Sequence, residues 1–279
     1  MTRKRILSAA VLLGLFFLSL GFDRLRWLLA VMIVVFGVLC LLEIGQLISA
    51  KNLRFPYPLC LLFLIALGAD GYFAGLRHGL AIFAGSVIIL LTWRVLRCDY
   101  GNLAAELGSA LLATVYVGLP MGAAAALSRM TDPTGAPIGS ALLIYQTAVV
   151  FGGDSAAYFF GRHYGKRPFF PTISPKKTIE GAAASVVVSV ILAAIVTLLF
   201  PSLRQFFGFR HGLLLGLILG LMAPLGDLAE SAFKRDAGRK DSGSDFTGHG
   251  GFLDIFDALL FGLPIQFFYI QLVLANLQV

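Results

Sequence analysis

Repeated apolar runs of about 20 residues are the feature that most limits how this chain can fold. A helix of that length crosses the hydrocarbon core of a bilayer. Hydrophobic residues make up 58% of the sequence and charged residues only 13%, whereas soluble domains carry roughly 25% charged residues. The candidate spans are residues 6–22, 25–49, 56–74, 78–98, 105–127, 139–160, 180–200, 211–230 and 255–275. The sequence therefore predicts an all-α, polytopic integral membrane protein with about nine transmembrane helices.

The distribution of Lys and Arg residues predicts the orientation of these spans, because short basic loops stay in the cytoplasm. With nine spans and a cytoplasmic N-terminus, most of the 22 Lys and Arg residues fall on the cytoplasmic side. Residues 6–22 and 56–74 are short runs, so eight spans remain an alternative. We expect a retained first helix instead of a cleaved signal peptide, since no small-residue cleavage site precedes the second span.

The pattern divides the chain into two regions. Residues 1–135 are expected to form an amino-terminal transmembrane scaffold, in which Glu43 is an unexplained acid inside an apolar span. Residues 136–279 are expected to form a catalytic transmembrane region, with cytoplasmic loops at 161–179 and 231–254. The net charge of +7 is explained by these basic loops beside anionic lipid, so we expect no nucleic-acid partner.

Charged residues concentrate in residues 226–257. Carboxylates bind hard cations such as Mg²⁺, basic side chains bind phosphate, and glycines let the backbone approach a ligand. The stretch combines all three kinds of residue. Its acids are Asp227, Glu230, Asp236, Asp241, Asp245, Asp254 and Asp257, and its bases are Lys234, Arg235, Arg239 and Lys240. The composition predicts a site that handles a metal-bound phosphate.

Three acids from three different spans are predicted to reach the same depth. Asp154, Asp227 and Asp254 each lie near the cytoplasmic end of a span. Glu230 shares a helix face with Asp227, and Asp257 shares one with Asp254. An acid inside a span needs a partner or a wet cavity, so an interhelical hydrogen bond is the alternative for Asp154. The convergence favours a magnesium site for phosphoryl or nucleotidyl transfer.

A second basic motif, residues 174–181, precedes the seventh candidate span. Thr178 is placed to cap that helix, and Glu180 suits its first turn. Lys176 and Lys177 can then reach an anion at the positive helix N-terminus. The alternative is that these lysines only anchor a cytoplasmic loop.

The sequence His249-Gly250-Gly251 precedes the last span. Its glycines can offer backbone N–H groups to a phosphate at a helix start. His249 is a candidate phosphate ligand or proton donor to a leaving group, and a solvated loop histidine is the alternative.

At these positions the chain resembles the phosphatidate cytidylyltransferases, also called CDP-diacylglycerol synthases. The family signature is Ser-x-apolar-Lys-Arg, four residues, Lys-Asp, and further on His-Gly-Gly, two residues, Asp-Arg-x-Asp. The matching residues are Ser231, Phe233, Lys234, Arg235, Lys240, Asp241, His249, Gly250, Gly251, Asp254 and Asp257. The resemblance covers roughly residues 140–275. Thr247 stands where the family usually has Pro, Gly or Ser, and Ile255 where it usually has Arg. The missing Arg removes one phosphate or carboxylate contact.

The resemblance implies transfer of CMP from CTP to phosphatidate, giving CDP-diacylglycerol and pyrophosphate. It implies Mg²⁺ as the cofactor, with a second cation as an open alternative, and the family suggests a homodimer. The predicted catalytic residues are Asp227, Asp254, Lys240, Asp241 and His249. The predicted substrate-binding residues are Ser174, Lys176, Lys177, Thr178, Lys234, Arg235, Gly250 and Gly251. The predicted metal ligands are Asp154, Asp227, Asp254 and Asp257. We expect a bacterial cytoplasmic (inner) membrane protein whose active site faces the cytoplasm.

Other functions compete with this assignment. A CDP-archaeol synthase or a CTP-dependent polyprenol kinase would also join CTP to a membrane lipid. The motif of CDP-alcohol phosphotransferases is not found in the sequence. A transporter commonly has intramembrane acids near the midplane, whereas these acids gather at one face, and no internal repeat is detected. A purely structural membrane protein leaves the Lys-Asp and His-Gly-Gly motifs without a purpose.

Overall fold

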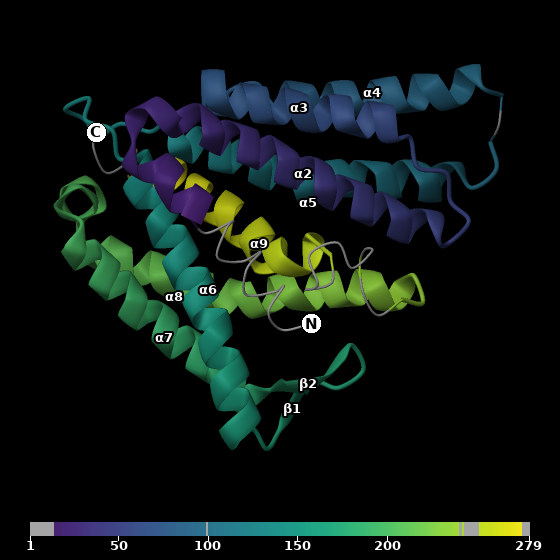
Figure 1. Ribbon diagram of the computed structural model, residues 1–279. Coiled ribbons are helices and arrows are strands. Elements are labelled where there is room, and N and C mark those ends of the chain that lie inside the picture. Colours follow the sequence, from purple (N-terminus) through teal and green to yellow (C-terminus); the bar gives the residue numbers. More distant parts are fainter. Residues whose placement is uncertain (1–13, 99, 240–241, 243–250, 275–279) are drawn as a thin grey trace. The chain divides into compact units, whose positions relative to one another are not determined.

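The computed structural model describes residues 14–98, 100–239, 242 and 251–274 (Figure 1). Within these ranges, seven helices are long and apolar enough to cross a membrane. They are α2 (Arg26–Ser49), α3 (Tyr57–Ala74), α4 (Gly79–Leu96), α5 (Leu103–Ser128), α7 (Ile179–Leu199), α8 (Pro201–Asp236) and α9 (Leu253–Tyr269). The short elements η1 (Asp23–Leu25) and η2 (Ile270–Leu274) flank this set. The prediction of an all-α polytopic membrane protein is confirmed.

Two of the predicted spans differ from this set of seven. Helix α6 (Gly139–Tyr164) forms as predicted, but its polar residues, such as Gln146 and Asp154, keep its hydropathy below that of the others. The predicted span 6–22 lies largely outside the described residues, of which 14–21 are helical. Helix α8 begins ten residues before its predicted start and contains a kink at Gly208, where φ is 71°.

The chain forms two compact units, and neither is continuous in sequence. The first contains Met1–Ala126 and Phe233–Phe256, and the second contains Leu127–Ala232 and Asp257–Val279. The predicted boundary at residue 135 is a functional division and stays a prediction. The returning segment of the first unit holds the end of α8 and the beginning of α9, so residues of the family signature pack among the amino-terminal helices.

The first unit is built on α2 to α5. Helix α3 packs against α2 and α4, and Gly71 of α3 touches the backbone of Gly122 on α5. Arg94 on α4 is fully buried, with Nη1 2.9 Å from Glu106 Oε2 on α5. A buried charge is tolerated only with such a partner, so this pair ties α4 to α5 inside the apolar core.

The second unit is built on α6, α7 and most of α8 and α9. Helices α6 and α7 pack along one another. The Tyr145 hydroxyl on α6 donates to the Gly212 carbonyl on α8 at 2.5 Å, and Gln266 on α9 donates to the Leu142 carbonyl at 3.0 Å. These buried bonds satisfy polar groups that lipid would leave unpaired, and they fix α8 and α9 against α6.

The predicted cytoplasmic loop at 161–179 is partly regular structure. Helix α6 continues to Tyr164, and an antiparallel hairpin follows, with strands β1 (Pro168–Phe170) and β2 (Ser174–Thr178). Figure 1 shows this hairpin at one end of α6 and α7. The Gly181 N–H donates to Thr178 Oγ1 at 3.1 Å, so the predicted cap of α7 is confirmed. Glu180 accepts hydrogen bonds from the backbone N–H groups of Lys166 and Arg167, which holds the hairpin against α7.

Candidate active site

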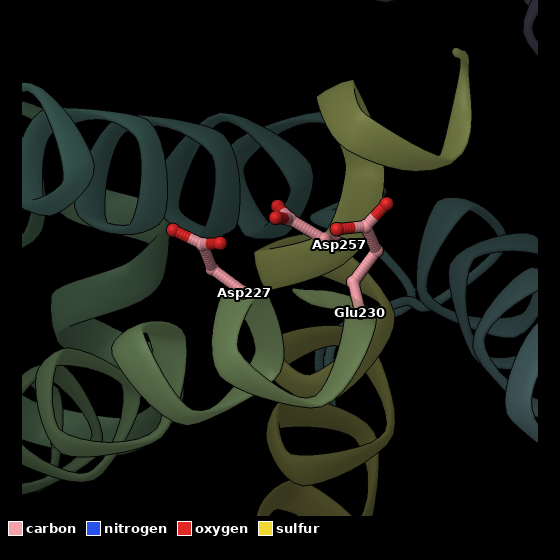
Figure 2. A group of neighbouring side chains, drawn as sticks. All are labelled: Asp227, Glu230 and Asp257. Carbon is pink, nitrogen blue, oxygen red and sulfur yellow. The ribbon is translucent and has the colours of Figure 1, made fainter. Parts of the chain in front are cut away.

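Three carboxylates meet between α8 and α9 in the second unit (Figure 2). Asp227 and Glu230 lie on one turn of α8, and Asp257 lies on the facing turn of α9. One oxygen from each lies within 4.8 Å of the others. Gly226 permits this approach, because a Cβ there would lie 2.8 Å from the Asp257 carbonyl oxygen. The shared face predicted for Asp227 and Glu230 is confirmed, while the participation of Glu230 as a third carboxylate was not predicted.

The three carboxylates of this cluster are buried to different degrees. Glu230 is completely buried, Asp257 is 8% exposed, and Asp227 is half-buried. Negative charges repel strongly where water is scarce, so three adjacent carboxylates favour a bound cation. Carboxylate oxygens are the ligands that Mg²⁺ prefers, and Mg²⁺ is usually shared with substrate phosphates. The donor set therefore fits the predicted magnesium ion, and it adds Glu230 to the predicted candidate ligands.

A cavity of about 590 Å³ lies beside this cluster in the second unit. That volume is typical of small-molecule sites, about 300–1,000 Å³. Its walls come from α6, the hairpin, the start of α7 and α8. The polar and charged lining residues are Asp154, Tyr158, Arg162, Lys176, Lys177, Thr178 and Asp227. Asp154 and Asp227, predicted to converge from separate spans, do line one cavity.

Basic side chains line the same cavity and can hold an anion. Lys177 Nζ lies 2.6 Å from Asp227 Oδ2, so β2 reaches the carboxylate cluster through an ion pair. Arg162 donates to the Tyr158 hydroxyl at 3.0 Å, one turn apart on α6. Tyr158 lies one turn from Asp154 on α6, and Arg162 lies one turn further on. The four-residue spacing of Asp154, Tyr158 and Arg162 is the signal that identifies this face of α6.

Asp254 has a different set of neighbours, in the first unit. Its Oδ1 pairs with Lys234 Nζ, and its Oδ2 accepts the Gly251 N–H at 2.8 Å. Ser242 Oγ lies 2.9 Å from the same oxygen. Asp254 is thus bound by protein donors, and its predicted role as a metal ligand stays a prediction. The contact between Lys234 and Asp254 joins two residues that the family signature separates by 20 positions.

The remaining predicted site residues either are not among the cavity-lining residues or lie outside the described part of the chain. Ser174 begins β2 and is not among the described residues that line the cavity. Arg235 is exposed and donates to the Arg239 carbonyl at 3.2 Å. Four predicted residues lie outside the described part of the chain: Lys240, Asp241, His249 and Gly250.

Comparison with known proteins places this chain in a family. A family model described as the cytidylyltransferase family matches residues 3–273. The chain is 37% identical over 194 residues to a phosphatidate cytidylyltransferase of Bacillus subtilis, covering 69% of this chain and 68% of that protein. It is 45% identical over 123 residues to a phosphatidate cytidylyltransferase of Staphylococcus haemolyticus, covering 44% of this chain and 46% of that protein.

An uncharacterized protein of Escherichia coli is also similar, with 37% identity over 147 residues, 53% of this chain and 48% of that protein. The chain thus spans about half the length of the Staphylococcus and Escherichia relatives and about two thirds of the Bacillus relative. The family model, in contrast, extends over nearly the whole chain. A lysine-lined cavity beside buried carboxylates is compatible with nucleotidyl transfer, and the chain belongs to the cytidylyltransferase family.

Proposed function

We propose that this chain is a membrane-embedded phosphatidate cytidylyltransferase. It transfers CMP from CTP to the phosphate of phosphatidate and releases pyrophosphate. The observation that carries the proposal is the buried cluster of Asp227, Glu230 and Asp257 beside a cavity lined by Lys176 and Lys177. Cation-binding and phosphate-binding groups thus meet at one place in a chain whose helices lie in lipid.

The reaction needs the protein to neutralise charge more than to supply a nucleophile. A phosphate oxygen of phosphatidate attacks the α-phosphorus of CTP, and the bond from that phosphorus to the oxygen bridging to the β-phosphate breaks. The electron pair leaves with pyrophosphate. Both substrates are anions, so they repel one another until positive groups hold them in line. Lys176, Lys177 and Arg162 supply that charge in the cavity.

The lysine next to the cluster also forms an ion pair with one of its carboxylates. Lys177 neutralises part of the charge of Asp227 and keeps its oxygen at a fixed position. Asp227, Glu230 and Asp257 would hold Mg²⁺, with Asp154 on the same cavity wall. When bound, Mg²⁺ supplies electrostatic stabilisation of the phosphate oxygens. Asp254 remains a predicted ligand from the preceding turn of α9.

The location of the substrates supports a site on the cytoplasmic face. CTP is a soluble nucleotide, and phosphatidate arrives by lateral diffusion with its acyl chains in the bilayer. A basic hairpin next to the cavity agrees with the positive-inside orientation. We place the protein in a bacterial cytoplasmic membrane, with the active site facing the cytoplasm. The homodimer that the family suggests stays a prediction.

The experiment uses protein purified in detergent, phosphatidate, Mg²⁺ and CTP labelled at the α-phosphate. We expect label in the lipid phase with Mg²⁺ and none with excess EDTA, and restoration by added Mg²⁺. Parallel reactions contain CTP labelled at the γ-phosphate, or an ether-lipid or polyprenol acceptor. Transfer of γ-label would identify a kinase, and exclusive use of another acceptor would identify a related CTP-dependent enzyme.

Well-folded protein that labels no lipid contradicts the proposal. An Ile255→Arg variant, which restores the residue usual in the family, then separates two explanations. Recovery of transfer would show that this chain is a weakened member, and continued inactivity toward every acceptor would exclude CTP-dependent lipid chemistry.

A further inference from the structure

Glu43, the unexplained acid of α2, contacts the beginning of α9. Its Oε1 accepts the Phe252 N–H at 2.8 Å, and its Oε2 accepts the Leu253 N–H at 2.8 Å. The first N–H groups of a helix have no partner within the helix and are usually capped by a residue just before it. Here the cap comes from a carboxylate 210 positions earlier in the chain. A negative charge also suits the positive end of a helix dipole.

The same carboxylate reaches Asp254 through one hydroxyl group. Ser242 Oγ lies 3.1 Å from Glu43 Oε2 and 2.9 Å from Asp254 Oδ2. A serine hydroxyl has a single proton, so it donates to one of the two carboxylates at a time. Lys234 pairs with the other oxygen of Asp254. Two carboxylates, one hydroxyl and one ammonium group thus form a connected network around the first turn of α9.

Gly251 is the residue that allows this network to close. A Cβ at position 251 would collide with both the Ser242 hydroxyl and the Glu43 carboxylate. Its backbone N–H donates to Asp254 at 2.8 Å. The second glycine of the His-Gly-Gly motif is therefore required by close packing against Glu43, in addition to any contact with substrate.

Apolar contacts hold the same two helices together beside the polar network. The ring of Phe36 on α2 lies 4.8 Å from that of Phe256 and 5.8 Å from that of Phe252, centroid to centroid. Phe36 and Glu43 are seven residues apart, so they share one face of α2. The packing sets the distance between α2 and α9, and the carboxylate sets the rotation and the start of α9.

We propose that Glu43 is a positioning residue: it fixes the first turn of α9 and, through Ser242, the orientation of the Asp254 carboxylate. The catalytic part of this inference rests on the proposed function, in which Asp254 is a predicted catalytic residue. Glu43 touches neither substrate nor cofactor in this role. It acts by keeping Asp254 in one orientation during turnover.

The test compares Glu43→Gln and Ser242→Ala with two controls. Glu43→Gln keeps the size of the side chain but replaces one acceptor oxygen by a donor, and Ser242→Ala removes the bridging hydroxyl while leaving Glu43 in place. Phe36→Leu weakens the packing of α2 on α9 without touching the network. Gln46→Ala removes an exposed polar residue of the same helix.

Two readouts separate the structural claim from the catalytic one. In hydrogen–deuterium exchange, we expect Glu43→Gln to speed exchange at the start of α9 by about tenfold, since one of the two N–H groups loses its acceptor and the other loses a charged one. In the CMP-transfer assay, we expect both network variants to lower kcat about tenfold or more, with the KM for CTP within about threefold of wild type. Because both substitutions act on one network, their effects on kcat should be non-additive in the double variant, whereas Phe36→Leu should add.

Folded Glu43→Gln and Ser242→Ala proteins with wild-type kcat would overturn the positioning role. Unchanged exchange at the start of α9 in Glu43→Gln would overturn the capping role. A wild-type protein that transfers no CMP would instead overturn the proposed function, and the exchange measurement would still decide whether Glu43 holds α9.

Discussion

Lys177 Nζ lies 2.6 Å from Asp227 Oδ2, which joins the hairpin to the carboxylate cluster of α8 and α9. Both side chains line the cavity, and both are partly exposed, at 23% and 37%. A lysine that we propose binds phosphate is thus in contact with a carboxylate that we propose binds a cation. Because each group neutralises the other, the ion pair holds the hairpin against the carboxylate cluster before any substrate arrives. Substitution of either partner tests its role separately.

Loss of a carboxylate from the cluster should abolish turnover. Asp227→Asn and Asp257→Asn each remove a negative charge from the proposed cation site, so we expect CMP transfer to fall at least about 100-fold. The proteins should remain folded, because each substitution keeps the volume and relieves repulsion. Labelled-lipid formation measures the first effect and thermal unfolding the second. Asp236→Asn is the matched control on α8, since Asp236 pairs with Lys51 and is not among the described residues that line the cavity. Wild-type turnover by both cluster variants would refute the assignment.

Lys177 should contribute to substrate binding, in addition to neutralising and positioning Asp227. Lys177→Met removes a charge-assisted contact worth about 1.5–3 kcal/mol, so we expect kcat/KM for CTP to fall about 10–100-fold. Lys177→Arg keeps the charge and should retain more activity than Lys177→Met. The comparison control is Lys51→Met, which breaks an ion pair of similar length elsewhere. Equal kinetics for wild type and Lys177→Met would exclude a role for this lysine in the reaction.

Magnesium should stabilise the folded protein without any substrate. Bound cation relieves repulsion among Asp227, Glu230 and Asp257, and at 100 times its Kd it adds about 2.7 kcal/mol to the free energy of unfolding. We therefore expect Mg²⁺ to raise the Tm of wild-type protein in detergent and EDTA to reverse the rise. Asp257→Asn should lose most of this response. The same Mg²⁺-dependent rise in both proteins would place the cation elsewhere.

Close packing of α7 and α8 should make Gly216 sensitive to substitution. A Cβ at Gly216 would collide with the Cβ of Ala193 on α7, so Gly216→Ala forces the helices apart. We expect a loss of about 1–3 kcal/mol in the free energy of unfolding. Gly85→Ala on α4 is the control, because a Cβ there meets no atom within 4 Å. Alanine is the better helix former, so this control should be neutral or stabilising. Equal Tm values for the two variants would show that the close contact at Gly216 does not affect the stability of the fold.

Local rules explain how much of this protein was predictable from its sequence. Hydropathy over windows of about 20 residues located the helices, because burial in lipid depends on composition along a short segment. The cap at Thr178 was predictable for the same reason, since donor and acceptor are three residues apart. Helix periodicity also placed Asp227 and Glu230 on one face.

The partners of each charged side chain were decided by the tertiary structure. Asp254 and Asp257 lie on neighbouring turns of α9, yet Asp254 binds Lys234 and Asp257 joins Asp227 and Glu230. No role for Glu43 could be inferred from the sequence, because its hydrogen-bond partners at the start of α9 lie about 210 positions away. The sequence by itself determined a polytopic helical membrane protein with acids and bases for a metal-bound phosphate. Which carboxylates meet depends on how helix faces rotate and pack against one another, and that information is not contained in any single segment.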